Sequence, residues 1–121
     1  MVRTPGPGRL EERSMSSAAN PYLALSAYVV AGLDGVRRNL DPGEPNLGNL
    51  YSLSLEELRL RGIRILPQTL DESLAELKQD EVVQESLGVI YKEFVALKEA
   101  ELREFQRQVT PWEIDRYLTL F

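Results

Sequence analysis

The apolar positions of the chain recur at helical spacing over most of its length, separated by short stretches rich in glycine and proline. From 22 to 33 almost every residue is apolar or small, which predicts a helix buried on all sides. Asn20 and Pro21 mark its start, because asparagine is a favoured N-cap and proline is tolerated at the first helical position. We expect this helix to end near Asn39, before a loop.

Three further helix starts share one signature, in which a Ser or Thr cap is followed three residues later by Glu. They are Ser54 with Glu57, Thr69 with Glu72, and Thr110 with Glu113. Between the last two, a long helical pattern runs from about 81 to 108, and we expect Gly88 to bend or divide it. Its apolar positions are better explained by core packing than by a coiled coil, because too few heptads follow one another. The final segment, TPWEIDRYLTLF, is so apolar that something must cover it.

The N-terminal segment is different, because its prolines and glycines exclude a regular helix over residues 1–8. We interpret it as a loop that leads into a short strand. On that strand Arg9, Glu11 and Arg13 would project to one face, since side chains alternate. Such a row is either a solvated edge strand whose charges discourage aggregation, or a site at which the glutamate binds a hard cation and the arginines bind phosphate. The predicted architecture is mostly α-helical with a short N-terminal strand.

The amino-acid composition excludes or disfavours several kinds of partner and site. The 121 residues fit one domain, and 19 acidic residues against 14 basic ones give a net charge of −5, which disfavours nucleic acid and anionic membranes as partners. The absence of cysteine and histidine excludes disulfides, thiolate zinc sites and the commonest general base. No membrane span or signal pattern is evident, and we expect a cytoplasmic protein.

Several motifs in order resemble the C-terminal part of the catalytic domain of glutamine synthetase. They are GRLEER, NPYLALSAYVVAGLDGV, DPGEP and NLY, and they fall within residues 2–51 at nearly the spacing of that family. The later helices agree more loosely. The resemblance implies an α+β parent domain of which residues 1–121 form the C-terminal portion. The N-terminal β-grasp domain and most of the catalytic domain would lie outside this segment, so we expect its strand to lack neighbours.

The resemblance also implies roles for four residues. Glu11 stands where the family has a glutamate ligand of Mg²⁺ or Mn²⁺, and Arg9 matches an arginine on the nucleotide side of the site. Arg13 matches the catalytic arginine that meets the glutamate substrate and the transferring phosphoryl group. Arg3 matches a phosphate-contacting arginine, although its spacing from Arg9 is shorter than in the commonest bacterial members.

The implied activity is ATP-dependent ligation of the glutamate γ-carboxylate to ammonia or a small amine through a γ-glutamyl phosphate, in a homo-oligomer. The ending resembles divergent ligases, some of which use methylamine or polyamines, so the amine stays open. The segment after Tyr51 also departs from members that are adenylylated on that tyrosine. We expect the isolated chain to be inactive. The alternative is a stand-alone helical interaction protein that docks on ligase subunits or another partner.

Overall fold

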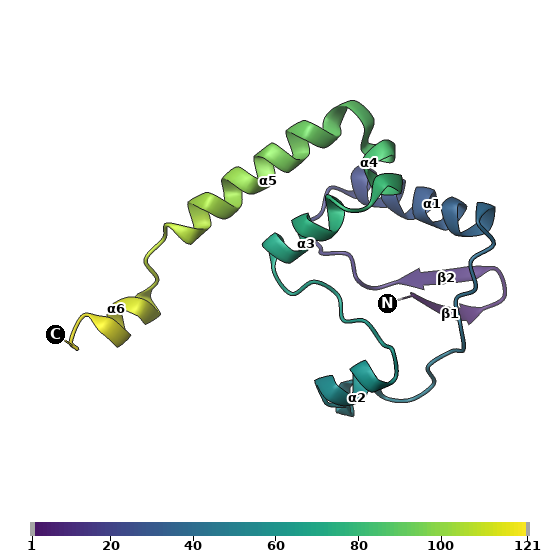
Figure 1. Ribbon diagram of the computed structural model, residues 1–121, viewed down its shortest axis with the longest axis horizontal. Helices are drawn as coiled ribbons and strands as arrows, with labels where there is room; N and C mark the ends of the chain where they lie inside the picture. The colour runs from purple at the N-terminus through teal and green to yellow at the C-terminus, as the bar shows by residue number, and fades with distance from the viewer. Residues whose placement is uncertain (1, 121) are drawn as a thin grey trace. The chain divides into compact units, whose positions relative to one another are not determined.

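The computed structural model describes residues 2–120, and it is mostly helical with a short N-terminal β-hairpin (Figure 1). The predicted fold class is therefore confirmed. No helix among these residues is long and apolar enough to cross a membrane. In chain order the elements are β1 (Val2–Gly6), β2 (Arg9–Glu12), α1 (Pro21–Arg37), η1 (Leu50–Ser52), α2 (Leu55–Leu60), α3 (Leu70–Leu77), α4 (Glu81–Leu87), η2 (Gly88–Ile90), α5 (Tyr91–Gln106) and α6 (Pro111–Tyr117).

These elements form two compact units. The first unit, residues 2–41 and 81–88, contains the hairpin, α1 and α4. The second unit, residues 42–80 and 89–120, contains the remaining helices. Gly88, at the boundary, adopts a φ of +53° that ordinary side chains rarely take. It ends α4 and begins a 3₁₀ turn before α5, so the long helical pattern is divided there, as expected.

The first unit begins with a strand pair where a loop and a lone strand were expected. β1 and β2 are antiparallel, and Pro7 and Gly8 form the turn between them, with a φ of +69° at Gly8. This proline–glycine turn is why the expectation was wrong, since the residues that exclude a helix also allow the chain to reverse tightly. The strand at Arg9–Glu12 therefore has one neighbour within this chain.

The pairing register brings charged residues together across the hairpin. Arg3 lies opposite Glu11, and Gly6 lies opposite Arg9. The register is irregular between Arg3 and Gly6, where Pro5 lies. Proline cannot donate to a ladder, so it is tolerated at such an irregularity.

Helix α1 is closed at both ends by local hydrogen bonds. The Asn20 side chain accepts from the Tyr22 amide at 3.0 Å, and Pro21 occupies the first turn, as predicted. At the C-terminus Asn39 has a φ of +50°, while the Leu40 amide donates to the Gly35 carbonyl at 2.9 Å. This is a Schellman-type ending. The helix proper ends at Arg37, two residues before the expected end.

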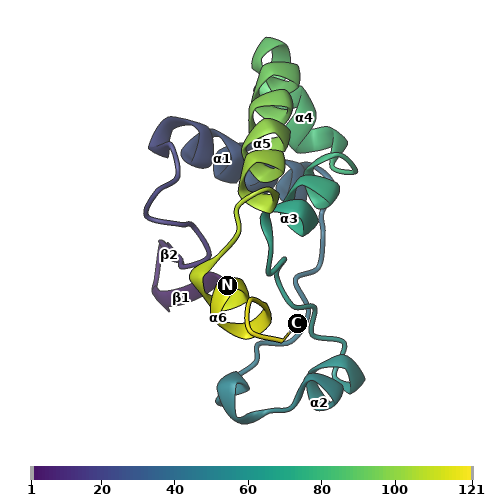
Figure 2. The same cartoon turned by 90° about the vertical axis from the view of Figure 1, so that its left-hand side faces the viewer.

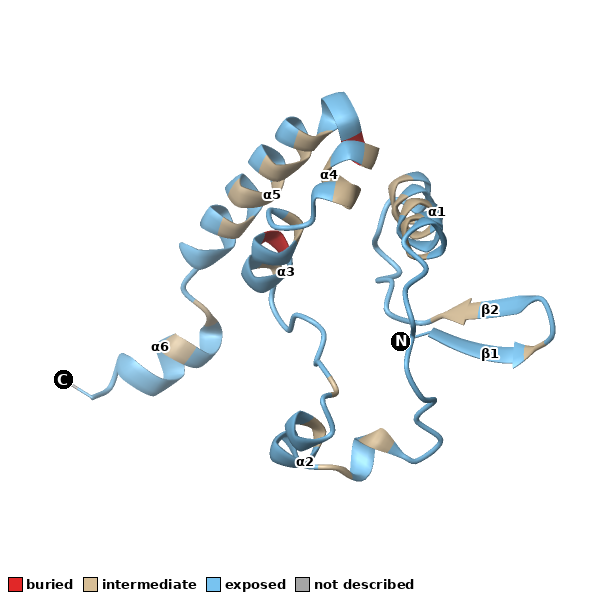
Figure 3. Ribbon diagram, turned by 45° about the vertical axis from the view of Figure 1, so that its right-hand side comes forward, coloured by how far each residue is buried: buried red, intermediate tan, exposed pale blue. Residues whose placement is uncertain are grey.

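The expectation that α1 is buried on all sides is wrong for this chain. None of its residues is buried (Figure 3), and Val29 keeps 59% of its surface exposed. Within the first unit α1 packs against α4, where Leu87 is buried, and the two helices meet in both views (Figure 2). One neighbouring helix covers one side of a helix that is apolar all round, so the other sides remain exposed.

In the second unit α3 packs against α5. Leu74 of α3 is only 4% exposed, and an ion pair joins Lys78 Nζ to Glu99 Oε1 at 2.6 Å. The Glu99 carboxylate raises the pKa of Lys78, and the Lys78 ammonium lowers the pKa of Glu99. Because both groups are exposed, packing around Leu74 is the main tertiary contact of this helix pair.

The predicted capping boxes form fully at two of three positions. At α2 and α6, Ser54 and Thr110 accept from the amides of Glu57 and Glu113, whose carboxylates accept from the cap amides in return. At α3, Thr69 accepts from the Glu72 amide, but the Glu72 carboxylate accepts from the Gln68 amide at 2.6 Å instead. The prediction of a full capping box at α3 is therefore wrong, because the Glu72 carboxylate accepts from the amide of Gln68, the residue before the cap.

The apolar C-terminal segment is exposed in this chain. Trp112 and Tyr117 meet edge to face, with ring centroids 6.0 Å apart, yet Trp112 remains 64% exposed. We expected another part of a protein to pack over this segment, and no part of residues 2–120 does so.

We predict that Leu74→Ala separates α3 from α5. Removing a buried leucine side chain costs about 2 to 5 kcal/mol. Amide hydrogen exchange should show lost protection along α3, whereas Leu60→Ala, at an exposed position of α2, should change little. Unchanged protection of α3 in Leu74→Ala would contradict the packing described above.

The capping boxes predict a pH dependence. Hydrogen bonds from the cap residues hold the pKa of Glu57 and of Glu113 below the usual 4.5. A carboxyl with a lowered pKa in the folded chain stabilises it above its unfolded pKa, and this contribution is lost as pH falls through the folded pKa. Carbon-13 NMR titration should show that Ser54→Ala returns the pKa of Glu57 toward 4.5 and leaves that of Glu113 in place. An equal shift at both glutamates would argue against local capping.

Candidate phosphate and metal site on the hairpin

Three of the four predicted site residues meet on the hairpin, and we call Arg3, Glu11 and Arg13 the arginine–glutamate cluster. Arg3 Nε lies 3.1 Å from Glu11 Oε2, and Arg13 Nε bonds to Glu11 Oε1. Each carboxylate oxygen therefore accepts from a different arginine. The register of the hairpin explains the first contact, because Arg3 lies directly opposite Glu11.

Arg9 does not join this cluster. It begins β2 opposite Gly6, beside the Pro7–Gly8 turn, and has no ion-pair partner among residues 2–120. Arg13 lies one residue beyond the end of β2 and still reaches Glu11. The structure thus brings together Arg3, Glu11 and Arg13, whereas the sequence alternation grouped Arg9 with the latter two.

The cluster contributes little to stability. The side chains of Arg3 and Arg13 are 52% and 53% exposed, and exposed ion pairs are worth roughly 0 to 1 kcal/mol. Such weak pairs can be exchanged for a ligand at small cost. Guanidinium groups bind phosphate or carboxylate through two parallel hydrogen bonds, so these arginines are suited to an anionic ligand.

A divalent cation fits this site only in part. Glu11 is a carboxylate of the kind Mg²⁺ accepts, but both of its oxygens already accept from arginines. Residues 2–120 contain no group of three or more Asp, Glu, His or Cys side chains that could hold a metal. Glu11 therefore fits as one ligand, and the others would be phosphate oxygens, water or groups from outside the described residues.

A second set of contacts, which the sequence analysis missed, surrounds Arg13. The Glu12 carboxylate accepts from both the amide and the hydroxyl of Ser14, and we call this the Glu12–Ser14 clamp. The Ser14 hydroxyl also lies 3.4 Å from the Tyr28 hydroxyl of α1. The hydrogen bonds from Ser14 lower the pKa of Glu12 to about 2, so Glu12 is ionised at neutral pH. A serine two residues after a strand-end glutamate was the only sequence signal for this clamp.

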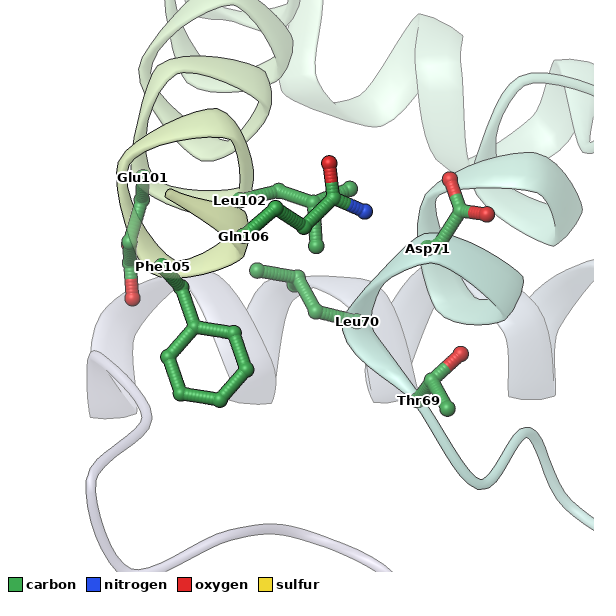
Figure 4. Close-up of a pocket in the computed structure, with 7 residues that line it drawn as sticks. All are labelled: Thr69, Leu70, Asp71, Glu101, Leu102, Phe105 and Gln106. Carbon is green, nitrogen blue, oxygen red and sulfur yellow. The ribbon is translucent and has the colours of Figure 1, made fainter. Parts of the chain in front are cut away.

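A separate groove of about 600 Å³ lies between α3 and the C-terminal half of α5 (Figure 4). Leu70, Leu102 and Phe105 form its apolar part, and Asp71 and Glu101 are the charged residues of its lining. None of the predicted site residues lines it. Its carboxylates make it a poor site for phosphate.

Comparison with known proteins relates the hairpin to a family. The profile of the glutamine synthetase catalytic domain matches residues 1–117 of the chain. The match includes the whole arginine–glutamate cluster and the Glu12–Ser14 clamp.

Curated relatives are similar over most of this chain. A glutamate–methylamine ligase from Methyloversatilis universalis is 46% identical over 121 residues, which are all of this chain and 27% of that protein. A glutamine synthetase from Methanosarcina mazei is 42% identical over 113 residues, which are 93% of this chain and 25% of that protein. The chain thus spans about a quarter of the length of these relatives.

A solved structure agrees with the fold. The structure described as apo GmaS without ligand superimposes with a TM-score of 0.80 and 34% sequence identity, and the match covers 98% of this chain and 27% of that one. From the family profile and these relatives we conclude that the chain belongs to the glutamine synthetase catalytic domain family.

Proposed function

We propose that the chain forms the C-terminal part of the active-site domain of an ATP-dependent glutamate–amine ligase. The observation that carries this proposal is the arginine–glutamate cluster, two guanidinium groups around one carboxylate, in a segment that belongs to the family. Its reaction joins the γ-carboxylate of glutamate to ammonia or a small amine.

The proposed reaction has two steps. A γ-carboxylate oxygen of glutamate attacks the γ-phosphorus of ATP, and ADP leaves. The amine nitrogen then attacks the carbonyl carbon of the γ-glutamyl phosphate, inorganic phosphate leaves, and a proton is released. Phosphoryl transfer depends on positioning and on neutralising the charge that spreads over the oxygens. Arginines can position the phosphoryl group and neutralise its charge, so the part of the active site proposed for this chain needs no histidine or cysteine.

Each residue has a proposed role. Arg13 binds the glutamate carboxylate and the phosphoryl group in transfer, and Arg9 and Arg3 bind nucleotide phosphates. Glu11 would hold Mg²⁺ or Mn²⁺, which when bound supplies further neutralisation of phosphate charge. When Glu11 binds the cation, the guanidinium on that oxygen becomes free for phosphate.

The amine and the assembly are also proposed. One relative that matches the full chain is a glutamate–methylamine ligase and another relative is a glutamine synthetase, so both methylamine and ammonia are candidate substrates. We place the complete enzyme in the cytoplasm, where ATP and glutamate are available, as a homo-oligomer. The exposed apolar sides of α1 and α6 support burial in a larger protein.

We predict that Arg13→Ala and Glu11→Gln each lower ligase activity about 100-fold, since removing one transition-state donor typically costs that much. The test places residues 1–121 in the matching segment of the Methyloversatilis universalis ligase and measures ATP-dependent glutamate–methylamine ligation. Arg107→Ala and Glu85→Gln, exposed and outside the hairpin, serve as matched controls. Equal activity in all four variants would refute the assigned roles.

We further predict that the isolated chain does not catalyse the reaction. The described residues contain no group of three or more side chains that could hold a metal ion, and they bury only Leu74 and Leu87, which is too little core to fix an active site. Purified protein should form no γ-glutamyl hydroxamate from glutamate, ATP and hydroxylamine. Measurable ATP-dependent product would show that this segment holds a complete site.

The exposed C-terminal segment favours one alternative, a stand-alone interaction protein that docks through α6 on ligase subunits. An adaptor has no need of the arginine–glutamate cluster. Replacing Arg3, Glu11 and Arg13 together by alanine should then leave docking intact, whereas Trp112→Ala should weaken it.

A further inference from the structure

We propose that Ser14 and Tyr28 are positioning residues for Arg13, acting through the Glu12–Ser14 clamp. This inference rests on the proposed function, because it assumes that Arg13 touches the reacting groups. It concerns side chains for which neither the sequence motifs nor the comparisons suggest a role.

Arg13 needs local support because it lies outside the strand ladder. β2 ends at Glu12, and the last pair among the described residues joins Glu12 to Val2. Arg13 therefore has no cross-strand partner within residues 2–120 that would fix its backbone. The ion pair to Glu11 holds only the guanidinium end of the side chain.

The clamp closes around the Arg13 backbone. The Glu12 carboxylate accepts from the Ser14 amide and hydroxyl, so the residues before and after Arg13 are joined to one another. Hydrogen bonds to an ionised carboxylate are stronger than those between neutral groups. The clamp therefore restrains the backbone on both sides of Arg13.

Tyr28 connects this clamp to the helix scaffold. The Ser14 hydroxyl has one proton, which it donates to Glu12, so at the 3.4 Å contact the Tyr28 hydroxyl is the donor and Ser14 Oγ the acceptor. Tyr28 lies in α1, whose start is fixed by the Asn20 cap. The turn bond from the Ala19 amide to the Ser16 carbonyl, at 3.1 Å, shapes the intervening loop.

The clamp becomes important when a ligand binds. If Glu11 turns to a cation, Arg13 loses the partner that holds its guanidinium in the ligand-free chain. The bonds through Glu12, Ser14 and Tyr28 do not involve Glu11 and would persist. They would keep Arg13 aimed at the phosphoryl group during transfer, and a misplacement of about 1 Å can cost up to about 100-fold in rate.

The test measures steady-state kinetics in the ligase that carries residues 1–121, with Tyr28→Phe and Ser14→Ala. We expect kcat to fall about tenfold with KM for ATP unchanged, since misplacement affects the transfer step. Matched controls are Tyr22→Phe and Ser17→Ala, from α1 and from the same loop as Ser14, because neither hydroxyl has a hydrogen bond among residues 2–120. Both controls should retain full kcat.

Adding Arg13→Ala separates the inference from the proposed function. If Tyr28 acts through Arg13, Tyr28→Phe should lower kcat no further once Arg13 is alanine. Full kcat in Tyr28→Phe and Ser14→Ala, with a large loss in Arg13→Ala, would overturn the positioning role and leave the proposed function standing. Full kcat in Arg13→Ala would overturn the proposed function itself.

A second measurement tests the inference even if a variant ligase fails to fold or assemble. In the 121-residue chain, nitrogen-15 relaxation of the Arg13 backbone amide, which lies between the two residues of the clamp, should report greater mobility in Tyr28→Phe than in Tyr22→Phe. Equal mobility in the two variants would overturn the inference without any activity assay.

Discussion

Hydrogen bonds that close the ends of elements hold this chain in shape, because the described residues bury only two apolar side chains, Leu74 and Leu87. Asn20 caps α1, Ser54 caps α2 and Thr110 caps α6. Such caps satisfy amides that have no partner inside the helix. Each is worth about 1 kcal/mol, so they define elements without supplying the burial that stabilises a domain.

The candidate site is also formed by contacts between residues that lie close together in the sequence. The Pro7–Gly8 turn pairs the two strands, the pairing places Arg3 opposite Glu11, and Arg13 reaches the same carboxylate from just beyond the strand. Everything needed for this arrangement lies within about a dozen residues of chain. A site built so locally can keep its geometry even where little core surrounds it, and it lies in a segment that spans about a quarter of the length of the relatives it matches.

The exposed apolar surfaces point to a larger structure. α1 is apolar around its whole circumference but is packed on only one side within the first unit, and α6 presents an exposed tryptophan. Large apolar side chains exposed together on one helix are typical of an interaction surface. In the proposed ligase, the rest of the catalytic domain or a neighbouring subunit would cover it, and the clamp from Tyr28 would connect the covered helix to Arg13.

The sequence by itself determined the helices and their starts, because caps and hydrophobic periodicity act over a few residues and are written in order along the chain. The motifs from GRLEER to NLY were also enough to identify the family. Only the tertiary structure decided that residues 2–6 form a strand, that Arg3 rather than Arg9 shares Glu11, and that Tyr28 meets Ser14. Those outcomes depend on pairing register and on contacts between residues 8 to 14 positions apart, which no local pattern specifies.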